Sequence, residues 1–251
     1  MIKCKKIFRS IGEIQVYQLE DDSLMLHNDL YQINMAESYW NDNIHEKMAV
    51  FDLYFRKMPF NSGYAVFNGL KRVIDFIEHF GFSESDLEYL KSIGYKDDFL
   101  SYLKDLKFTG SIRSMQEGEL CFGNEPLLRV EAPLIQAQLI ETILLNIVNF
   151  HTLITTKASR IRQIASNDKL MEFGTRRAQE IDAALWGARA AYIGGFDSTS
   201  NVRAGKLFGI PVSGTHAHAF VQTYGDEYVA FKKYAERHKN CVFLVDTFHT
   251  L

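Results

Sequence analysis

The chain contains few cysteines, and this shortage excludes two classes of small, cross-linked protein. Its three cysteines are Cys4, Cys121 and Cys241, which are widely spaced along 251 residues. This spacing provides neither a disulfide framework nor the paired thiolates of a zinc site. Scarce, unpaired cysteine is typical of a reducing compartment, so we expect a cytoplasmic protein.

An excess of basic charge is also lacking. The 28 Lys and Arg residues are outnumbered by 31 Asp and Glu residues, and the formal net charge is -3. No basic run with interleaved aromatic residues occurs. The sequence therefore has no electrostatic footprint of nucleic-acid binding, and we expect no nucleic-acid partner.

Long uninterrupted apolar runs are missing as well. The longest apolar stretch, at 139–150, is interrupted by Glu141, Thr142 and Asn146, which favours a buried helix over a membrane span. No apolar segment of a secretory signal follows the basic N-terminus. Hydrophobic residues make up 47% of the chain and charged residues 24%, as in a soluble globular protein. We expect one large or two ordinary domains and no membrane partner.

The first half of the chain has mixed helical and strand patterns. Helical spacing occurs at 28–39 and 70–80, an alternating strand pattern at 50–55, and acidic helical segments continue to residue 103. From 110 to 130 the pattern becomes that of strands separated by turns. These patterns predict a mixed α+β domain at 1–130.

The second half alternates strands with helices. Pro133 opens a long helix that is apolar on most sides. Short strands are then expected at 169–173, 193–196, 210–213 and 241–246, with helices at 177–191, 199–208 and 219–238 between them. This alternation predicts a parallel sheet or barrel of the α/β class at 131–251.

A barrel that begins at Pro133 is incomplete. A full (β/α)8 barrel takes about 250 residues, and fewer than half that number follow Pro133. The last strand is also not followed by a helix that would cover it. We therefore expect a truncated chain that holds the N-terminal part of a longer protein.

Polar motifs follow three of the expected strands, where α/β folds collect their chemistry. At Phe173-Gly174-Thr175-Arg176-Arg177, two arginines at a helix start oppose the helix dipole, which indicates a bound anion unless they are simply solvated. Asp197 and Ser198 follow a glycine pair and can cap the next helix or help bind an anion. Without further context, a plain cap is the simpler interpretation.

The His216-Ala-His218 sequence at the third strand end leaves several roles open. Residues two apart on a strand point the same way, so the pair could bind a metal. One imidazole could instead be a nucleophile or base oriented by Asp246, or both could be ordinary surface or core histidines. Tyr31, by spacing alone, is a packed aromatic on an amphipathic helix.

Together these motifs resemble the nicotinate phosphoribosyltransferase family, whose members are type II phosphoribosyltransferases. The resemblance extends over nearly the whole chain in order and spacing. The segments that carry it are LYQINM at 30–35, FRKMPF at 55–60, LLNIVNF at 144–150 continuing to Lys157, EFGTRRAQ at 172–179, GGFDSTSN at 194–201, GTHAH at 214–218 and VDT at 245–247.

The resemblance implies an enzyme of NAD biosynthesis by salvage. It implies synthesis of nicotinate mononucleotide and pyrophosphate from nicotinate and phosphoribosyl pyrophosphate, a ligase and glycosyltransferase reaction. ATP is the co-substrate, its hydrolysis is coupled through a phosphohistidine, and Mg2+ is the cofactor. The implied fold is an irregular TIM-like α/β barrel with a second α/β domain, in a cytoplasmic homodimer whose active sites are shared. This truncated chain alone is expected to be inactive.

The resemblance also implies roles for individual residues. His218 is similar to the phosphorylated histidine, and Asp246 to the carboxylate that orients it. The residues that resemble substrate contacts are Tyr31 from the partner subunit, Phe173, Thr175, Arg176, Asp197 and Thr215. Ala219 and His249 depart from the family pattern, where serine and aspartate or asparagine are common. No residue is assigned to a resident metal.

Two other interpretations compete with this one. A metal-dependent hydrolase on a TIM-type barrel could use His216 and His218 as ligands, although the pair comes late in the chain and a third ligand is not evident. Alternatively, the chain could be an inactive fragment or a binding module that keeps part of a pocket.

Overall fold

The computed structural model describes residues 23–248, so Cys4 and His249 lie outside the described residues. Within this range the chain divides into two compact units, each assembled from separate segments. One unit contains residues 23–51, 71–113 and 129–145, and the other contains 52–70, 114–128 and 146–248. The domain boundary predicted between residues 130 and 131 stays a prediction.

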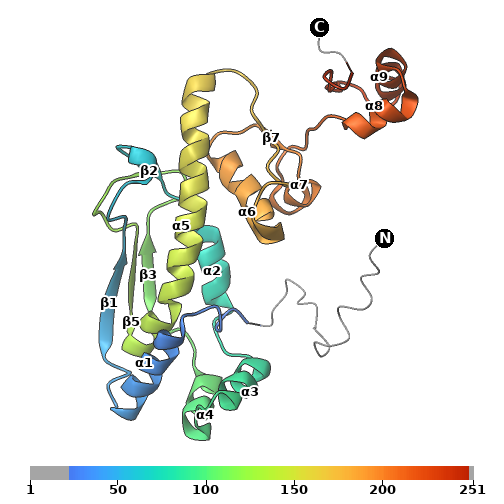
Figure 1. The fold of residues 1–251 in the computed structure, drawn as a ribbon. Coiled ribbons are helices and arrows are strands. Elements are labelled where there is room, and N and C mark those ends of the chain that lie inside the picture. The colour runs from blue at the N-terminus through green and yellow to red at the C-terminus, as the bar shows by residue number, and fades with distance from the viewer. Residues whose placement is uncertain (1–22, 249–251) are drawn as a thin grey trace. The chain divides into compact units, whose positions relative to one another are not determined.

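The first unit combines a three-stranded sheet with short helices (Figure 1). The strands are hydrogen-bonded in the order β1 (Met48–Leu53), β5 (Leu128–Pro133) and β3 (Ser111–Ser114). The helices are α1 (Leu30–Asn41), α2 (Leu70–Glu78), α3 (Glu84–Ser92) and α4 (Asp97–Asp105). The helices predicted at 28–39 and 70–80 and the strand predicted at 50–55 are confirmed, with their ends shifted by a few residues.

Local sequence explains where these helices begin and which face they bury. Helix α3 starts with a capping box, in which Ser83 Oγ accepts from Asp86 N–H at 3.1 Å and Asp86 Oδ2 accepts from Ser83 N–H at 2.8 Å. Helix α4 buries Phe99, Leu100 and Leu103, which share one helical face. The apolar spacing therefore sets the packing of this unit.

Helix α5 (Leu134–Ala165) is 32 residues long and begins directly after Pro133, the last residue of β5. Among the described residues it is the one helix long and apolar enough to cross a membrane, and 56% of its most apolar window is buried. Its later turns also carry buried hydroxyls. Thr156 Oγ1 accepts from Val66 N–H at 2.9 Å, and Thr152 Oγ1 accepts from Asn68 N–H at 3.2 Å. Such satisfied contacts are those of a core helix, as the sequence predicts.

The second unit contains two small sheets. Strands β2 (Ala65–Val66) and β4 (Leu120–Cys121) pair antiparallel, and β6 (Met171–Glu172) and β7 (Ser198–Thr199) pair parallel. Single parallel bridges join Thr199 to Val212 and Thr215 to Val242. The helices are α6 (Glu180–Ile193), α7 (Val202–Phe208), α8 (His218–Tyr224) and α9 (Glu227–Ala235). The predicted parallel α/β arrangement is confirmed in this coarse form.

Two local predictions are wrong. The strand predicted at 193–196 does not form, because α6 continues to Ile193 and a turn at Gly194-Gly195 follows it. A Cβ on Gly194 would lie 2.6 Å from the Thr155 carbonyl oxygen, so the backbone of this turn packs directly against the backbone of α5. The single helix predicted at 219–238 is two helices, since Gly225 ends α8 with a φ of 70° and Asp226 caps α9.

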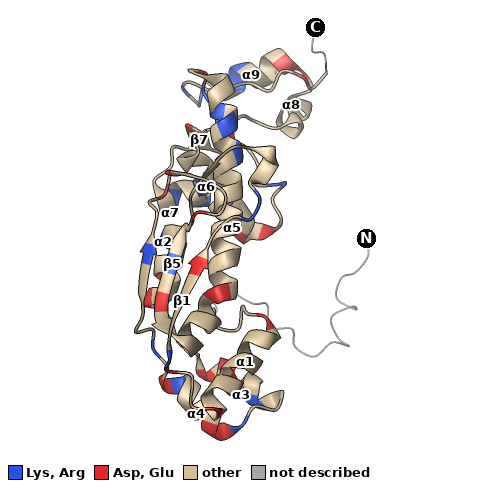
Figure 2. Ribbon diagram, turned by 90° about the vertical axis from the view of Figure 1, so that its left-hand side faces the viewer, with Lys and Arg blue, Asp and Glu red and all other residues tan. Residues whose placement is uncertain are grey.

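Charged residues of both signs are distributed along the chain. Figure 2 shows Lys and Arg residues interspersed with Asp and Glu residues along the helices and strands. This mixture agrees with the small net charge of -3.

Candidate active site

Parallel pairing brings the polar motifs to the same ends of neighbouring strands. Strand β6 precedes the motif that begins at Phe173, and β7 is registered beside it through Glu172 and Thr199. Val212, which precedes Gly214-Thr215, pairs in parallel with Thr199. Because the carboxyl ends of parallel strands meet at one edge, three motifs that are distant in sequence follow adjacent strand positions.

The turn after β6 presents an arginine to solvent. The Gly174 carbonyl oxygen accepts from Arg177 N–H at 2.8 Å and from Ala178 N–H at 2.9 Å, which closes the turn. Thr175 and Arg176 lie within it and are exposed, and no described residue pairs with the Arg176 guanidinium. Phe173 has an exposed fraction of 38%. The turn can therefore offer a cation and an aromatic ring to a planar anion.

Asp197 is engaged with its own chain. Its Oδ2 accepts from Leu170 N–H at 2.7 Å and from Arg162 Nη2 at 2.5 Å. The Leu170 amide, followed by the Arg162 guanidinium, lowers the pKa of Asp197. Arg162 also donates to the Gly195 carbonyl oxygen at 2.7 Å, so it fastens this loop to α5. Sequence reasoning missed Arg162, because nothing in the pattern of α5 identifies it.

The two histidines of the His-Ala-His sequence have different surroundings. His216 is buried among the rings of Phe220, Phe231, Tyr234 and Phe243, at centroid distances from 5.1 to 6.0 Å. Its Nε2 accepts from Leu244 N–H at 3.3 Å, and its buried Nδ1 has no partner among the described residues. His216 is thus a packed core residue.

His218, by contrast, is half exposed and lies beside two polar side chains. Its Nδ1 is 3.1 Å from Thr247 Oγ1, and its Nε2 is 3.9 Å from Asp246 Oδ1. The expectation that both imidazoles point the same way is wrong. Ala217 is the N-cap of α8 and His218 is its first residue, so the strand ends between the two histidines. Sequence reasoning gave Thr247 no role, although it follows Asp246 directly.

The remaining predicted residues lie at separate places. Thr215 is half-buried, donates from Oγ1 to the His216 carbonyl oxygen at 2.9 Å and pairs in parallel with Val242. Tyr31 is on α1 in the first unit, with an exposed fraction of 52%. Its predicted place across a dimer interface stays a prediction.

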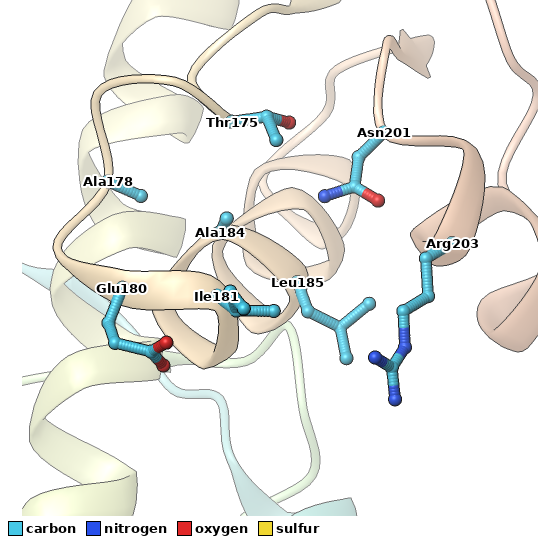
Figure 3. Close-up of a pocket in the computed structure, with 8 residues that line it drawn as sticks. All are labelled: Thr175, Ala178, Glu180, Ile181, Ala184, Leu185, Asn201 and Arg203. Carbon is cyan, nitrogen blue, oxygen red and sulfur yellow. The ribbon is translucent and has the colours of Figure 1, made fainter. Parts of the chain in front are cut away.

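An open cleft of about 320 Å³ lies at the start of α6 (Figure 3). It is lined by Thr175, Ala178, Glu180, Ile181, Ala184, Leu185, Asn201 and Arg203. Its floor is apolar, and Thr175 is the one predicted site residue in its lining. Glu180 has a φ of 83°, which is strained for a residue with a side chain. Its carboxylate accepts from the N–H groups of Ile181 and Asp182, and these bonds lower the pKa of Glu180.

A resident metal centre finds no support in the described part of the chain. No group of three or more His, Cys, Asp or Glu side chains within residues 23–248 could hold a metal ion. His216 is also buried among aromatic rings while His218 is half exposed, so the two imidazoles do not face a common metal position. The structure therefore does not support the metal-dependent hydrolase interpretation.

Comparison with solved structures first defines the class. The chain superimposes on nicotinate-nucleotide pyrophosphorylase from Pyrococcus furiosus with a TM-score of 0.77 and 23% identity, over 95% of this chain and 55% of that one. It also superimposes on human nicotinic acid phosphoribosyltransferase with a TM-score of 0.73 and 41% identity, over 78% of this chain and 40% of that one. The mixed α/β fold thus matches the structures of phosphoribosyltransferases.

Sequence comparison then defines the family. Residues 26–149 match the nicotinate phosphoribosyltransferase (NAPRTase) N-terminal domain, and residues 169–243 match the nicotinate phosphoribosyltransferase (NAPRTase) family. The chain is 66% identical to nicotinate phosphoribosyltransferase of Bacillus subtilis over 236 residues, which is 94% of this chain. The chain belongs to the nicotinate phosphoribosyltransferase family. It spans 48% of the length of that relative, or about half.

Proposed function

We propose that this chain forms part of an enzyme that joins nicotinate to phosphoribosyl pyrophosphate, coupled to ATP hydrolysis. The single observation that carries the proposal is the position of His218. Its imidazole lies between Thr247 and Asp246, and it follows Val212, which pairs in parallel with β7. Strand β7 pairs in turn with β6, the strand that precedes Phe173, Thr175 and Arg176. The proposed nucleophile and the proposed anion site thus follow the outer two of three parallel strand positions, in a chain of this family.

In the proposed reaction the ring nitrogen of nicotinate attacks the anomeric carbon of the ribose. The new C–N bond forms as the bond to pyrophosphate breaks, and pyrophosphate leaves with its electron pair. The Arg176 guanidinium and the Thr175 hydroxyl would hold the nicotinate carboxylate, and Phe173 would stack on the ring. Holding the ring in this way lowers the entropic cost of bringing the two substrates together.

The surroundings of His218 suggest which nitrogen accepts phosphate. Nε2 faces Asp246, so Asp246 would hold the Nε2 proton, while Nδ1, beside the Thr247 hydroxyl, attacks the γ-phosphorus of ATP. The N–P bond forms, the P–O bond to ADP breaks, and the imidazolium that results is offset by the Asp246 carboxylate. Hydrolysis of this phosphohistidine would couple ATP cleavage to nucleotide synthesis.

We propose that Mg2+ enters the site as a companion of the substrate phosphates. Mg2+ is usually bound by one or two carboxylates together with substrate phosphates and water. When bound, Mg2+ would offset charge on the departing pyrophosphate.

The quaternary arrangement and the finer fold are part of the same proposal. We propose a cytoplasmic homodimer in which Tyr31 of the partner subunit covers the nicotinate ring, and an irregular TIM-like barrel to which residues 131–251 contribute the first part. Asp197 would contact the base and ribose through Oδ1, since its Oδ2 is engaged by Leu170 and Arg162.

Binding and labelling are measured on the purified chain, and turnover is measured on a longer protein that contains it, because this chain alone is expected to be inactive. Calorimetry with nicotinate and with nicotinamide measures base preference, [γ-32P]ATP measures labelling of His218, and chromatography measures nicotinate mononucleotide. We expect preferential nicotinate binding and ATP-dependent labelling. A folded chain that binds neither base and is not labelled would contradict the proposal. Binding without labelling or turnover would instead favour the binding-module interpretation.

Shared active sites are tested separately by subunit mixing. A Tyr31→Ala chain is mixed with an Arg176→Ala chain, each of which is expected to bind nicotinate more weakly on its own. If Tyr31 acts across the interface, mixed dimers regain one intact site and with it nicotinate binding. Proven mixed dimers that bind no nicotinate would place both residues in the same subunit's site.

A further inference from the structure

Glu172 joins the two strands that precede the proposed substrate loops. It is the last residue of β6 and is registered opposite Thr199 of β7. Its Oε2 accepts from Thr199 Oγ1 at 2.6 Å, and its Oε1 accepts from Gly174 N–H. Its own carbonyl oxygen accepts from Ser200 N–H at 3.0 Å. One side chain thus ties the start of the Gly174 turn to the end of β7.

Gly174 is required for this contact because the carboxylate occupies the space of a side chain. A Cβ on Gly174 would lie 2.7 Å from Glu172 Oε1, which is closer than real Cβ contacts. The same glycine carbonyl closes the turn by accepting from Arg177 N–H at 2.8 Å. Glu172 therefore anchors the first residue of the turn that presents Thr175 and Arg176.

Thr199 extends the connection to a third strand end. Its side chain is fully buried, and its Oγ1 also accepts from Asn201 N–H at 3.0 Å. Its backbone donates to the Pro211 carbonyl oxygen and accepts from Ser213 N–H, both at 3.0 Å. This buried hydroxyl both donates to Glu172 and accepts from Asn201, so a shift in its position would leave a buried polar group unpaired.

We propose that Glu172, acting through Thr199, is a positioning residue that sets the geometry of the nicotinate carboxylate site at Thr175 and Arg176. Both of its carboxylate oxygens are engaged by the protein, so it acts by holding the turn and does not touch substrate. The inference rests on the proposed function, because the ligand it concerns is nicotinate.

The first measurement does not depend on any substrate. Trypsin cleaves after Arg176 and Arg177, which are exposed in the turn. In Glu172→Ala the turn loses its anchor, and cleavage at these bonds should accelerate about 10-fold at an unchanged melting temperature. Glu236→Gln alters an exposed glutamate paired only with Lys233 and should leave the cleavage rate unchanged.

The second measurement links the turn to the ligand. Calorimetry should show nicotinate binding to Glu172→Ala weakened about 10-fold, with nicotinamide binding little changed, because nicotinamide lacks the carboxylate. Labelling of His218 by ATP should persist, since the surroundings of His218 are not part of the turn. A purely structural residue would weaken both bases and labelling together.

Thr199 provides variants that keep the inference testable if Glu172→Ala fails to fold. Thr199→Val removes the hydroxyl at nearly constant shape and should reproduce the effects of Glu172→Ala. Thr199→Ser keeps the hydroxyl and should retain the cleavage rate and nicotinate affinity of the unaltered chain. Accelerated cleavage with unchanged nicotinate affinity, or an equal effect of Val and Ser, would overturn the inference. Failure of the unaltered chain to bind nicotinate would contradict the proposed function itself.

Discussion

Replacing Arg189 with methionine should lower the unfolding free energy of the second unit by about 3 kcal/mol. Arg189 Nη2 lies 2.6 Å from Glu117 Oε2, and the two side chains have exposed fractions of only 14% and 17%. Glu117 Oε1 also accepts from Gly69 N–H at 3.1 Å. Removing the Arg189 guanidinium leaves the largely buried Glu117 carboxylate without the positive charge that neutralises it.

The expected magnitude follows from the burial of the pair. Breaking a buried ion pair by removing one partner costs about 3–5 kcal/mol. Residual exposure of both side chains places this pair at the lower end of that range. In a domain of this size, about 3 kcal/mol corresponds to a lowering of the melting temperature by about 6–12 °C. The Glu117→Gln, Arg189→Met double variant should lose less than the sum of the single variants, because no unpaired charge remains.

The assay uses one of the two tryptophans as a local reporter. The ring of Trp186 lies 5.0 Å from Phe208 and 5.4 Å from His151, all within the second unit. In a Trp40→Phe background, its fluorescence during guanidinium unfolding follows this unit. Lys233→Met, which breaks an exposed pair, is the control and should cost less than about 1 kcal/mol. A cost below about 1 kcal/mol for Arg189→Met, or full additivity in the double variant, would refute the reasoning.

Three further predictions concern individual side chains. His218→Asn should abolish ATP-dependent labelling, whereas His216→Asn should lower stability, because it disturbs a buried ring cluster, yet keep labelling in the folded protein. Arg176→Ala should weaken nicotinate binding by about 1.5–3 kcal/mol, the usual value of a charged hydrogen bond, at an unchanged melting temperature. Burial raises the pKa of the Cys121 thiol to about 11, so iodoacetamide at pH 8 should modify half-exposed Cys241 well before Cys121.

Each of these has an outcome that contradicts it. Mass spectrometry at alkaline pH would refute the first if phosphate were found on His216. Calorimetry would refute the second if Arg176→Ala bound nicotinate normally while its melting temperature fell. Peptide mapping would refute the third if Cys121 and Cys241 were alkylated at equal rates in the folded chain.

Periodicity predicted the elements that are long and locally determined. Helices α1, α2 and α5 follow apolar spacings that hold over several turns, so the local sequence of each is enough to predict that it is helical. The parallel α/β class also followed from the alternation of strands and helices, although β7 lies at Ser198–Thr199, where no strand was predicted. The break between α8 and α9 was missed, because the helical spacing on both sides concealed Gly225 and Asp226.

The sequence motifs predicted candidate site residues but not the geometry in which these residues lie. The motifs identified Arg176 and His218, whose surroundings are open in the structure. They could not show that His216 turns into a cluster of aromatic rings, since its partners lie up to 27 residues away in sequence. The roles of Arg162 and Glu172 depend on long-range hydrogen bonds, which no local pattern encodes.

The interleaving of the two units has a consequence for synthesis on the ribosome. Residues 52–70 and 114–128 emerge early, yet they belong with residues 146–248. Val66 N–H donates a hydrogen bond to Thr156 Oγ1, and Glu117 forms its ion pair with Arg189, which is synthesised later. At about 5–20 residues per second, Arg189 is added about 6–24 s after residue 70. During that interval these early segments are exposed on the nascent chain, because the residues that pack against them have not yet been synthesised. We therefore expect a chaperone to bind the nascent chain at these segments.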